Sequence, residues 1–440
     1  MMTINRRTFV KHTTLGLGAL TILPSAVLVG RRKAAPSDVV NVGLIGCRGQ
    51  GYWILENHMN NADAQCVALC DVDENVLNDK AAQVEKKQGK KPKLYKDYRD
   101  LLADKDIDAV IIGTPDHWHC LPFVEALQAG KDVYVEKPLA NSIGEIEVMQ
   151  SAAKRYSKQV VQVGQQQRSG THWADIMAMV HSGKLGKLRK IKVWGNFGYG
   201  IGQLMKPDEP VPAGVDFNTW LGPAPDRTFN PTRFHGSWRM FWDYGGGLMT
   251  DWGVHLLDMA LWAGKVDYMP MSVSSAGGNL SFPDYNHETP DTLSVVYQMK
   301  DFVLTWDHTA GIQSGPYNKP YGLAIQGDDA TIVANREFWE LKPENRNGSP
   351  TMEPILFEKG KNYHPEHVRN FLDCIKSRGT TNCTIDMGRM AGIYAHLGNL
   401  SQRGAGPVVY DETKRQIVNN KAANALVFPS YRKPWVLPKI

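Results

Sequence analysis

The chain has 440 residues, 42% of them hydrophobic, and carries 50 Lys and Arg against 45 Asp and Glu. Residues 1–34 hold six of the basic residues and no acid, so 50 minus 6 leaves 44 basic residues against 45 acids in the rest of the chain. This near-neutral balance argues against a nucleic-acid-binding or anionic-membrane-binding protein, and the length predicts a globular protein of two domains.

The first 34 residues have the layout of a twin-arginine export signal. The segment NRRTFVK, residues 5–11, precedes an uncharged stretch over residues 12–30. A membrane span needs about 20 mainly apolar residues, whereas Thr, Gly and Pro interrupt this stretch. We therefore expect cleavage near Ala34 or Ala35 and a periplasmic or otherwise exported protein with no stable membrane span. A retained transmembrane anchor is the less favoured alternative.

Residues 39–153 alternate short apolar runs with amphipathic stretches, which is the pattern of parallel β-α units. The apolar runs are VVNVGLIG (39–46), CVALCDV (66–72), AVIIGTP (109–115) and DVYVEKP (132–138), with one more strand expected at 160–164. Helices are expected around residues 51–60, 74–87 and 121–129. The expected fold class is α/β, with a doubly wound parallel sheet in an N-terminal Rossmann domain over residues 38–160.

After residue 164 the pattern changes to loops rich in Trp, Gly and Pro and to longer β-like runs. These runs are KIKVWGNFGYG (190–200), TLSVVYQM (292–299), FVLTWDHT (302–309) and GLAIQG (322–327). Two late helices are expected at 364–377 and 387–402. We expect a second α/β domain with an open, mostly antiparallel sheet over residues 161–405, followed by a tail over residues 406–440.

The six cysteines show no paired C-x-x-C spacing. Disulfide frameworks chiefly stabilise domains too small to bury a core, and this chain is long. We therefore expect packed free thiols rather than disulfides, although the protein is expected to be exported. The cysteines are Cys47, Cys66, Cys70, Cys120, Cys374 and Cys383.

The segment VGLIGCRGQG, residues 42–51, has the form of a strand that runs into a glycine-rich turn before a helix, where a dinucleotide pyrophosphate can bind. Arg48 occupies the second glycine position of G-x-G-x-x-G, so either Gly49 takes that role in a shifted turn or Arg48 points outward to a phosphate. Asp71 follows Gly46 by 25 residues and ends the second expected strand. A carboxylate there can accept ribose hydroxyls and repels a 2′-phosphate, which favours NAD over NADP. The alternative is a structural turn with a helix-capping Asp.

Three further motifs carry polar residues. His117 and His119 in GTPDHWH could suggest a metal, but a metal site needs three or four converging ligands and the chain shows no matching cluster, so no metal is expected. Lys137 follows the strand of VYVEKP and is either an exposed end residue or functional. Asp251 and His255 lie four residues apart, so they share one face of a helix, either as a packed polar pair or as functional groups. Together with Lys137 they offer a cation to polarise an oxygen and an imidazole to move its proton.

These motifs make the chain similar to the Gfo/Idh/MocA family of nicotinamide-dependent oxidoreductases over roughly residues 38–405. The matching segments are VGLIGCRGQG, the strand that ends at Asp71, TPDHWH, VEKP and GGGLMTDWGVHLLD. The resemblance implies a Rossmann domain, a substrate-binding α/β domain whose sheet forms homodimer or homotetramer contacts, and a cofactor cleft between them. It also implies a polyhydroxylated small-molecule substrate.

The resemblance implies roles for individual residues. It assigns catalysis to Lys137, Asp251 and His255. Within VGQQQR, residues 163–168, it places Gln165 near the cofactor and Gln166 and Arg168 near the substrate. With the glycine turn included, the expected cofactor neighbours are Gly46, Arg48, Gly49, Gly51, Asp71, Thr114, Pro115, His119, Glu136, Lys137 and Gln165.

Aromatic side chains crowd the same part of the second domain, and their faces suit sugar rings when hydrogen-bonding groups lie beside them. Part of this set can equally belong to the core. We take Arg239, Trp242 and His255 as further candidate substrate contacts. The whole set is Trp238, Arg239, Trp242, Tyr244 and Trp252.

The main hypothesis is an exported NAD-dependent dehydrogenase that removes hydride from a hydroxyl of a sugar or glycoside. In this hypothesis His255 acts as the base, Lys137 stabilises the developing alkoxide and Asp251 orients the pair. Because free NAD is scarce outside the cytoplasm, an alternative is a glycosidase that keeps NAD bound and oxidises its substrate transiently. A non-catalytic sugar-binding relative is the third interpretation.

Overall fold

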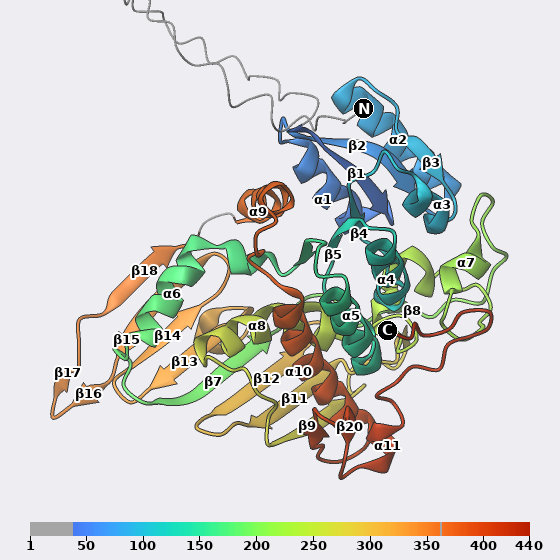
Figure 1. Cartoon of the computed structure of the whole chain (residues 1–440). Coiled ribbons are helices and arrows are strands. Elements are labelled where there is room, and N and C mark those ends of the chain that lie inside the picture. Colours follow the sequence, from blue (N-terminus) through green and yellow to red (C-terminus); the bar gives the residue numbers. More distant parts are fainter. Residues whose placement is uncertain (1–37, 361–362) are drawn as a thin grey trace, which may run out of the picture.

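The computed structural model describes residues 38–360 and 363–440, and the expected export signal lies outside this range. The N-terminal half forms a six-stranded parallel sheet in the order β3-β2-β1-β4-β5-β6, which is the Rossmann order (Figure 1). Its central strands are buried on both faces, which explains their continuous apolar sequences. The strands are β1 (Val40–Ile45), β2 (Ala64–Cys70), β3 (Lys93–Tyr95), β4 (Ala109–Ile112), β5 (Asp132–Val135) and β6 (Val161–Val163).

Five helices connect these strands, and polar side chains cap the starts of three of them, α2, α3 and α5. The Asp73 side chain accepts a hydrogen bond from the Asn75 backbone N–H at 3.0 Å at the start of α2, and Ser142 caps α5. Neither β3 and α3, which have only three and six residues, nor the 13-residue helix α5 was predicted from the sequence. The helices are α1 (Gly49–Met59), α2 (Glu74–Gln88), α3 (Tyr98–Ala103), α4 (Cys120–Gln128) and α5 (Ile143–Arg155).

Helix α9 (His364–Ser377) returns from the C-terminal half and packs beside α1 (Figure 1). Its Phe371 and Leu372 share an apolar core with Leu55 of α1. The N-terminal core therefore includes a helix from outside the expected range of residues 38–160.

The second domain contains an eight-stranded sheet in the order β18-β15-β14-β13-β7-β12-β11-β9. Only β7 and β12 pair in parallel, so the prediction of a mostly antiparallel sheet is confirmed. Helices α6 (Thr171–His181), α8 (Val254–Ala263) and α10 (Ile385–Arg403) lie along one side of this sheet (Figure 1). The strands are β7 (Leu188–Gly195), β9 (Ser272–Gly278), β11 (Thr292–Gln298), β12 (Val303–Thr309), β13 (Tyr321–Gly327), β14 (Ala330–Ala334), β15 (Phe338–Pro343) and β18 (Ile355–Lys359).

A long excursion between β7 and β9 crosses back to the N-terminal domain. Its residue Val215 forms a β-bridge with Asp73, and the Asp216 backbone N–H donates to the Val72 carbonyl at 2.9 Å. The excursion therefore covers the end of β2. It contains β8 (Gln203–Leu204), α7 (Phe217–Leu221) and the π-helical turn Met249–Gly253, and β8 pairs with β10 (Tyr285–Asn286).

The expected tail over residues 406–440 folds back onto the molecule. A hairpin of β19 (Tyr410–Asp411) and β20 (Gln416–Ile417) precedes the short helix α11 (Lys421–Asn424). The Gly144 backbone N–H then donates to the Val427 carbonyl at 2.8 Å, which attaches the final segment to the start of α5. The remaining short strands, β16 (Asn345–Arg346) and β17 (Ser349–Pro350), form an exposed hairpin.

All six cysteines lie in the described part of the chain, whereas the stretch considered as a membrane span, residues 12–30, lies outside it. All six cysteines are buried free thiols, as expected. Over the described residues, no helix combines the length and the apolar character that crossing a bilayer requires.

We expect His58 to make stability depend on pH. The ring is fully buried in α1, its Nδ1 lies 2.8 Å from the Ile54 carbonyl oxygen, and burial lowers its pKa to about 4. Because the unfolded pKa is about 6.5, stability contributed by the neutral ring is present above that pH and is lost as pH falls toward 4, by up to about 3 kcal/mol.

The variant His58→Gln should be less stable than the natural protein at pH 7, and this deficit should shrink as pH falls to 4. Urea unfolding at several pH values measures it, with His181→Gln on the partly exposed end of α6 as the control. A deficit that stays constant from pH 7 to 4 would show that His58 does not carry this dependence.

Candidate active site

A cavity of about 860 Å³ lies between the two domains, at the carboxyl ends of the parallel strands. Its volume falls in the range of ligand and cofactor sites, and its position matches the crevice where open α/β sheets bind ligands. Gly46, Asp71 and Lys137 contribute from the N-terminal domain, and Asp251 and His255 from the second.

The turn after β1 packs tightly against the loop after β4. Gly46 has φ +87°, and a Cβ there would lie 2.7 Å from the Thr114 backbone nitrogen. A Cβ on Gly51 would lie 2.2 Å from the Gly46 carbonyl oxygen. Arg48 adopts an extended conformation just before α1 and its exposed side chain lies at the cavity, while Gly49 has φ +42°.

The first turn of α1 suits an anion. No side chain caps this helix, so its first backbone N–H groups donate no hydrogen bond to a capping side chain. Uncapped N–H groups and the positive end of the helix dipole form a phosphate site when they face a cavity. Gly49 and Gln50 of this turn line the cavity.

Asp71 links the glycine turn to the end of β2. Its Oδ2 accepts the Cys47 backbone N–H at 2.7 Å, and its Oδ1 accepts the Asp73 N–H at 3.0 Å. Burial raises the pKa of Asp71, while these backbone donors act in the opposite direction. The two oxygens together have about four acceptor lone pairs, which is more than the backbone donors use. The carboxylate therefore stands on the cavity wall with acceptor capacity for ribose hydroxyls.

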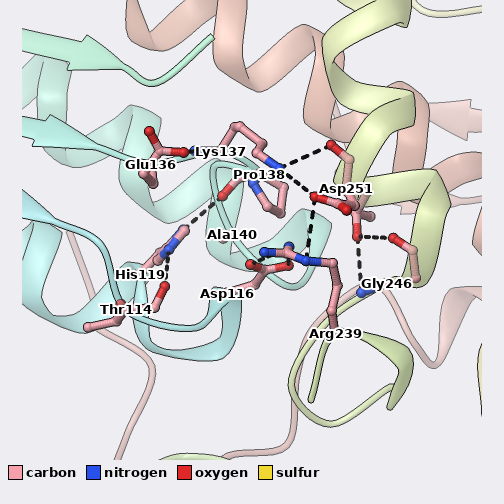
Figure 2. Close-up of polar contacts among 12 residues, drawn as sticks. Thr114, Asp116, His119, Glu136, Lys137, Pro138, Ala140, Arg239, Gly246 and Asp251 are labelled. Atoms are coloured by element: carbon pink, nitrogen blue, oxygen red, sulfur yellow. Dashed lines mark hydrogen bonds and ion pairs between the residues drawn. The ribbon is translucent and has the colours of Figure 1, made fainter. Parts of the chain in front are cut away.

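Lys137 and Asp251 form an ion pair across the domain boundary (Figure 2). The Lys137 Nζ lies 2.6 Å from Asp251 Oδ1 and 3.2 Å from the Asp251 carbonyl oxygen. Each side chain is only 12% exposed. Burial disfavours the Asp251 charge, but Arg239 and Lys137 outweigh it and hold the pKa of this carboxyl below its usual range.

Two residues that the sequence analysis did not name complete this polar cluster. Tyr199 donates its hydroxyl to Asp251 Oδ2 at 2.9 Å. Buried Asp116 accepts from Arg239 at 3.2 and 3.3 Å, and Arg239 also lies 3.4 Å from Asp251 (Figure 2). Burial raises the pKa of Asp116 to about 7, although Arg239 and Lys137 oppose this shift.

His255 follows Asp251 by four residues, on α8 just after the π-helical turn. Burial lowers its pKa well below the usual value, and the nearby cations Arg336 and Lys137 lower it further. The ring is therefore neutral at pH 7. Its Nδ1 has no hydrogen-bond partner within the described residues, although His255 lines the cavity.

Gly245, six residues before Asp251, allows the backbone of this segment to pass close to Arg239. A Cβ on Gly245 would lie 2.9 Å from the Arg239 Cα atom. The backbone leading into the π-helical turn can therefore pass directly beside Arg239. This contact places Arg239 and Asp251 on the same wall.

Other residues expected near the cofactor line the interdomain cavity or lie directly behind the residues that line it. Thr114 and Pro115 line the cavity, as does Glu136, whose Oε1 accepts from Gln166 Nε2 at 2.8 Å. His119 does not line it. Its buried ring lies 2.8 Å from the Pro138 carbonyl oxygen and 2.9 Å from that of Thr114, so it braces the two loops from behind (Figure 2).

Three expected site residues lie away from the cavity. Gln165 is buried and donates to the Val254 carbonyl at 3.3 Å. Arg168 pairs with buried Asp258 at 2.6 Å. Trp242 lies beside a smaller pocket, with the Arg403 guanidinium 4.6 Å from its ring centre. Arg168 and Trp242, both expected as substrate contacts, are therefore not among the residues that line the cavity.

Further cavity residues come from segments without a motif. Arg336, between β14 and β15, lies 4.3 Å from the centre of the Trp252 ring and donates to Gln167 at 3.0 Å. No carboxylate pairs with Arg336 among the described residues, and the sequence outside them holds no Asp or Glu. Trp435 reaches the cavity from the C-terminal segment. Only the Trp-Arg composition of these segments could have suggested either residue.

The residues fit a nicotinamide dinucleotide better than a metal ion. Residues 38–360 and 363–440 contain no group of three His, Cys, Asp or Glu side chains arranged for a metal. The uncapped α1 terminus, the close packing at Gly46 and the carboxylate of Asp71 instead suit a pyrophosphate and a ribose.

Comparisons with protein families agree with this architecture. Residues 40–165 match the model described as the oxidoreductase family, NAD-binding Rossmann fold, and residues 169–301 match the C-terminal alpha/beta domain of the same family. The two matches together cover more than half of the chain. The chain belongs to the Gfo/Idh/MocA oxidoreductase family.

Curated relatives match part of the chain. A glycosyl hydrolase family 109 protein from Shewanella putrefaciens is 32% identical over 159 residues, 35% of this chain and 34% of that protein. An alpha-N-acetylgalactosaminidase from Shewanella oneidensis is 28% identical over 207 residues, 43% of this chain and 45% of that protein. The chain therefore matches less than half of the length of these relatives.

Solved structures share the fold at lower sequence identity. Levoglucosan dehydrogenase, in complex with NADH and levoglucosan, is 18% identical with a TM-score of 0.64, over 84% of this chain and 98% of that one. The WlbA dehydrogenase from Bordetella pertussis, in complex with NADH and UDP-GlcNAcA, is 17% identical with a TM-score of 0.61, over 85% and 99%.

We expect Arg168 to act in stability rather than in substrate binding. The variant Arg168→Ala leaves the buried carboxylate of Asp258 without its cation, which should lower the free energy of unfolding by about 3–5 kcal/mol. Urea unfolding measures this loss, and the double variant Arg168→Ala/Asp258→Ala should recover part of it. A normal unfolding curve with a tenfold higher KM would contradict the assignment.

Proposed function

We propose that the protein uses NAD to oxidise a hydroxyl of a sugar or glycoside. One observation carries this proposal: Lys137 and Asp251, from different domains, meet beside a neutral His255 on the wall of a cavity at the carboxyl ends of a Rossmann sheet. A cation, an orienting carboxylate and a proton acceptor are the groups that oxidation of an alcohol requires.

Each residue has a distinct part in the proposed reaction. When bound, the nicotinamide supplies the hydride acceptor. His255 accepts the hydroxyl proton, since its low pKa keeps the ring unprotonated at neutral pH. Lys137 donates a hydrogen bond to the oxygen as negative charge develops on it. Asp251 and its partner Tyr199 hold the lysine in position.

A sugar is the substrate class that the remaining cavity residues favour. Trp252 stacks on Phe197 with ring centres 4.4 Å apart and presents an aromatic surface at the cavity. Arg239, Trp238 and Arg336 lie at the same cavity and supply donors beside an aromatic face. Aromatic faces next to hydrogen-bond donors match the alternating C–H and O–H surfaces of a sugar ring. Sugar-processing dehydrogenases among the solved structures support this assignment.

The proposal specifies NAD rather than NADP. In a Rossmann domain the acidic residue after the second strand binds the adenosine ribose, so a 2′-phosphate would bring a second anion against the Asp71 carboxylate, and this supports NAD.

A second candidate function is glycoside hydrolysis with a retained NAD that is reduced and reoxidised within each turnover. The names of the curated relatives favour it, since they include glycosyl hydrolase family 109 proteins and an alpha-N-acetylgalactosaminidase. The covering of β2 by the excursion also favours a nucleotide that stays bound. Sugar binding without turnover is the third outcome, and it would leave the Lys137–Asp251 pair without a chemical role.

We also propose export by the twin-arginine route and assembly into a homodimer or homotetramer. The twin-arginine motif of residues 5–11 motivates the first. For the second, β11 alternates buried and exposed residues and carries Val296 at 45% exposure, which leaves one face of the sheet free for contact between copies.

We expect Lys137→Ala to lose most of the sugar-oxidation rate while keeping nearly the natural affinity for NAD. Loss of the group that stabilises the developing oxyanion should lower kcat for sugar oxidation by about 100-fold or more. Stopped-flow measurement of NADH formation tests this, and fluorescence titration should show NAD affinity within a few-fold of the natural protein. Lys154→Ala, an exposed position on α5, is the control, and an unchanged rate for Lys137→Ala would rule out the role.

Product analysis separates the candidate functions. We expect incubation with a panel of sugars and aryl glycosides to yield NADH and a keto-sugar in equal amounts. Released aglycone without NADH would contradict a dehydrogenase and support the hydrolytic candidate. Saturable sugar binding with neither product would establish a binding protein.

A further inference from the structure

The C-terminal segment ends against the N-terminal domain at one end of the cavity. The Trp435 ring lines the cavity and meets the Trp118 ring edge-on, with centres 4.9 Å apart and an angle of 80°. The Arg99 guanidinium lies 5.4 Å from the Trp435 ring centre and pairs with Asp97 at 2.5 Å. An aromatic face and a planar cation thus stand together on this wall.

Two anchors hold this segment in place. The Tyr431 hydroxyl donates to Glu145 Oε1 at 2.6 Å, at the buried start of α5. Arg432 donates to the Asn218 side-chain and backbone oxygens at 2.8 and 2.9 Å and to the Gly222 carbonyl at 3.1 Å. The segment therefore connects the N-terminal domain to α7 of the excursion (Figure 1). Trp435 follows Arg432, the second anchor, by three residues.

The excursion between β7 and β9 also covers this end of the cavity, through contacts with the chain directly after β2. Asp216 and Val72 share a backbone hydrogen bond of 2.9 Å, and Val215 pairs with Asp73. His235 adds a contact of 2.9 Å from its Nε2 to Asp73 Oδ2. The covering thus spans the region directly after β2, where Asp71 faces the cavity.

The position of Asp71 identifies what this end of the cavity holds. In a Rossmann domain the acidic residue after the second strand binds the adenosine ribose, so the base lies beyond it. Lys96, Tyr98 and Arg99 from the start of α3, together with Trp118 and Trp435, line the cavity with Asp71. Indole rings and a guanidinium plane are surfaces on which a base stacks.

We propose that Trp435 and Arg99 form an adenine subsite and that the anchored segment of residues 431–435 slows release of the dinucleotide. This inference rests on the proposed function only in requiring that an adenine nucleotide binds the cavity. Dissociation then requires either loss of the stacking contacts or release of the Tyr431 and Arg432 anchors.

The test compares nucleotides with and without the adenosine group. The full chain is loaded with NAD or with nicotinamide mononucleotide, and the dissociation rate of each is measured by stopped-flow competition. The variant Trp435→Ala should release NAD about 10- to 100-fold faster, the loss expected for one stacked base, while release of the mononucleotide stays unchanged. Trp435→Phe should restore most of the slow release.

Two further variants keep the outcome interpretable. Val436→Ala changes a neighbouring side chain that is 70% exposed and does not line the cavity, so it should leave NAD release unchanged. Arg99→Met removes the cation while leaving the sequence of the C-terminal segment unchanged, and it should accelerate NAD release in the same selective way even if Trp435→Ala fails to fold.

The possible failures are distinguishable. The adenine subsite is disproved if NAD binds but Trp435→Ala and Arg99→Met release it at the rate of the natural protein. It is also disproved if these variants accelerate release of the mononucleotide as much as release of NAD. In both cases the proposed function stands. If neither nucleotide binds the natural protein, the proposed function fails as well.

Discussion

The Lys137–Asp251 ion pair is the contact on which the arrangement of this site depends. It joins the loop after β5 to the π-helical turn before α8, at 2.6 Å and with little solvent access. Burying two charges is costly unless further hydrogen bonds satisfy them. The Tyr199 hydroxyl donates such a bond to Asp251, and the Arg239 guanidinium adds a second positive charge 3.4 Å from the carboxylate. The pair is therefore stable only when the two domains meet in this one orientation, and that orientation brings His255 to the cavity.

Several independent connections maintain the same orientation. Helix α9 carries chain from the second half into the core of the first, and the excursion between β7 and β9 pairs with the chain after β2. The C-terminal segment adds contacts to Glu145 and Asn218. The cavity is thus enclosed by three crossings of the chain as well as by the ion pair, which suits chemistry that must exclude water.

Local sequence patterns predicted the sheets and the motif residues because each depends on near neighbours. Buried parallel strands require continuous apolar runs, and Gly46 is required where a Cβ would collide with the next loop. Residues that act through distant contacts were harder to place. Arg168 follows a cofactor-like segment but faces Asp258, 90 residues away, and Tyr199 reaches Asp251 only because the chain leaves the sheet after Gly195. The tail shows no periodic pattern, so its return to the cavity could not be predicted.

The most direct test of this account is a crystal structure of the protein with NAD and a sugar bound. The account predicts the nicotinamide between Lys137 and His255, with its reactive carbon about 3–3.5 Å from a sugar carbon whose hydroxyl contacts both side chains. A nicotinamide bound outside the interdomain cavity, or a sugar with no oxygen within hydrogen-bond distance of Lys137, would contradict it.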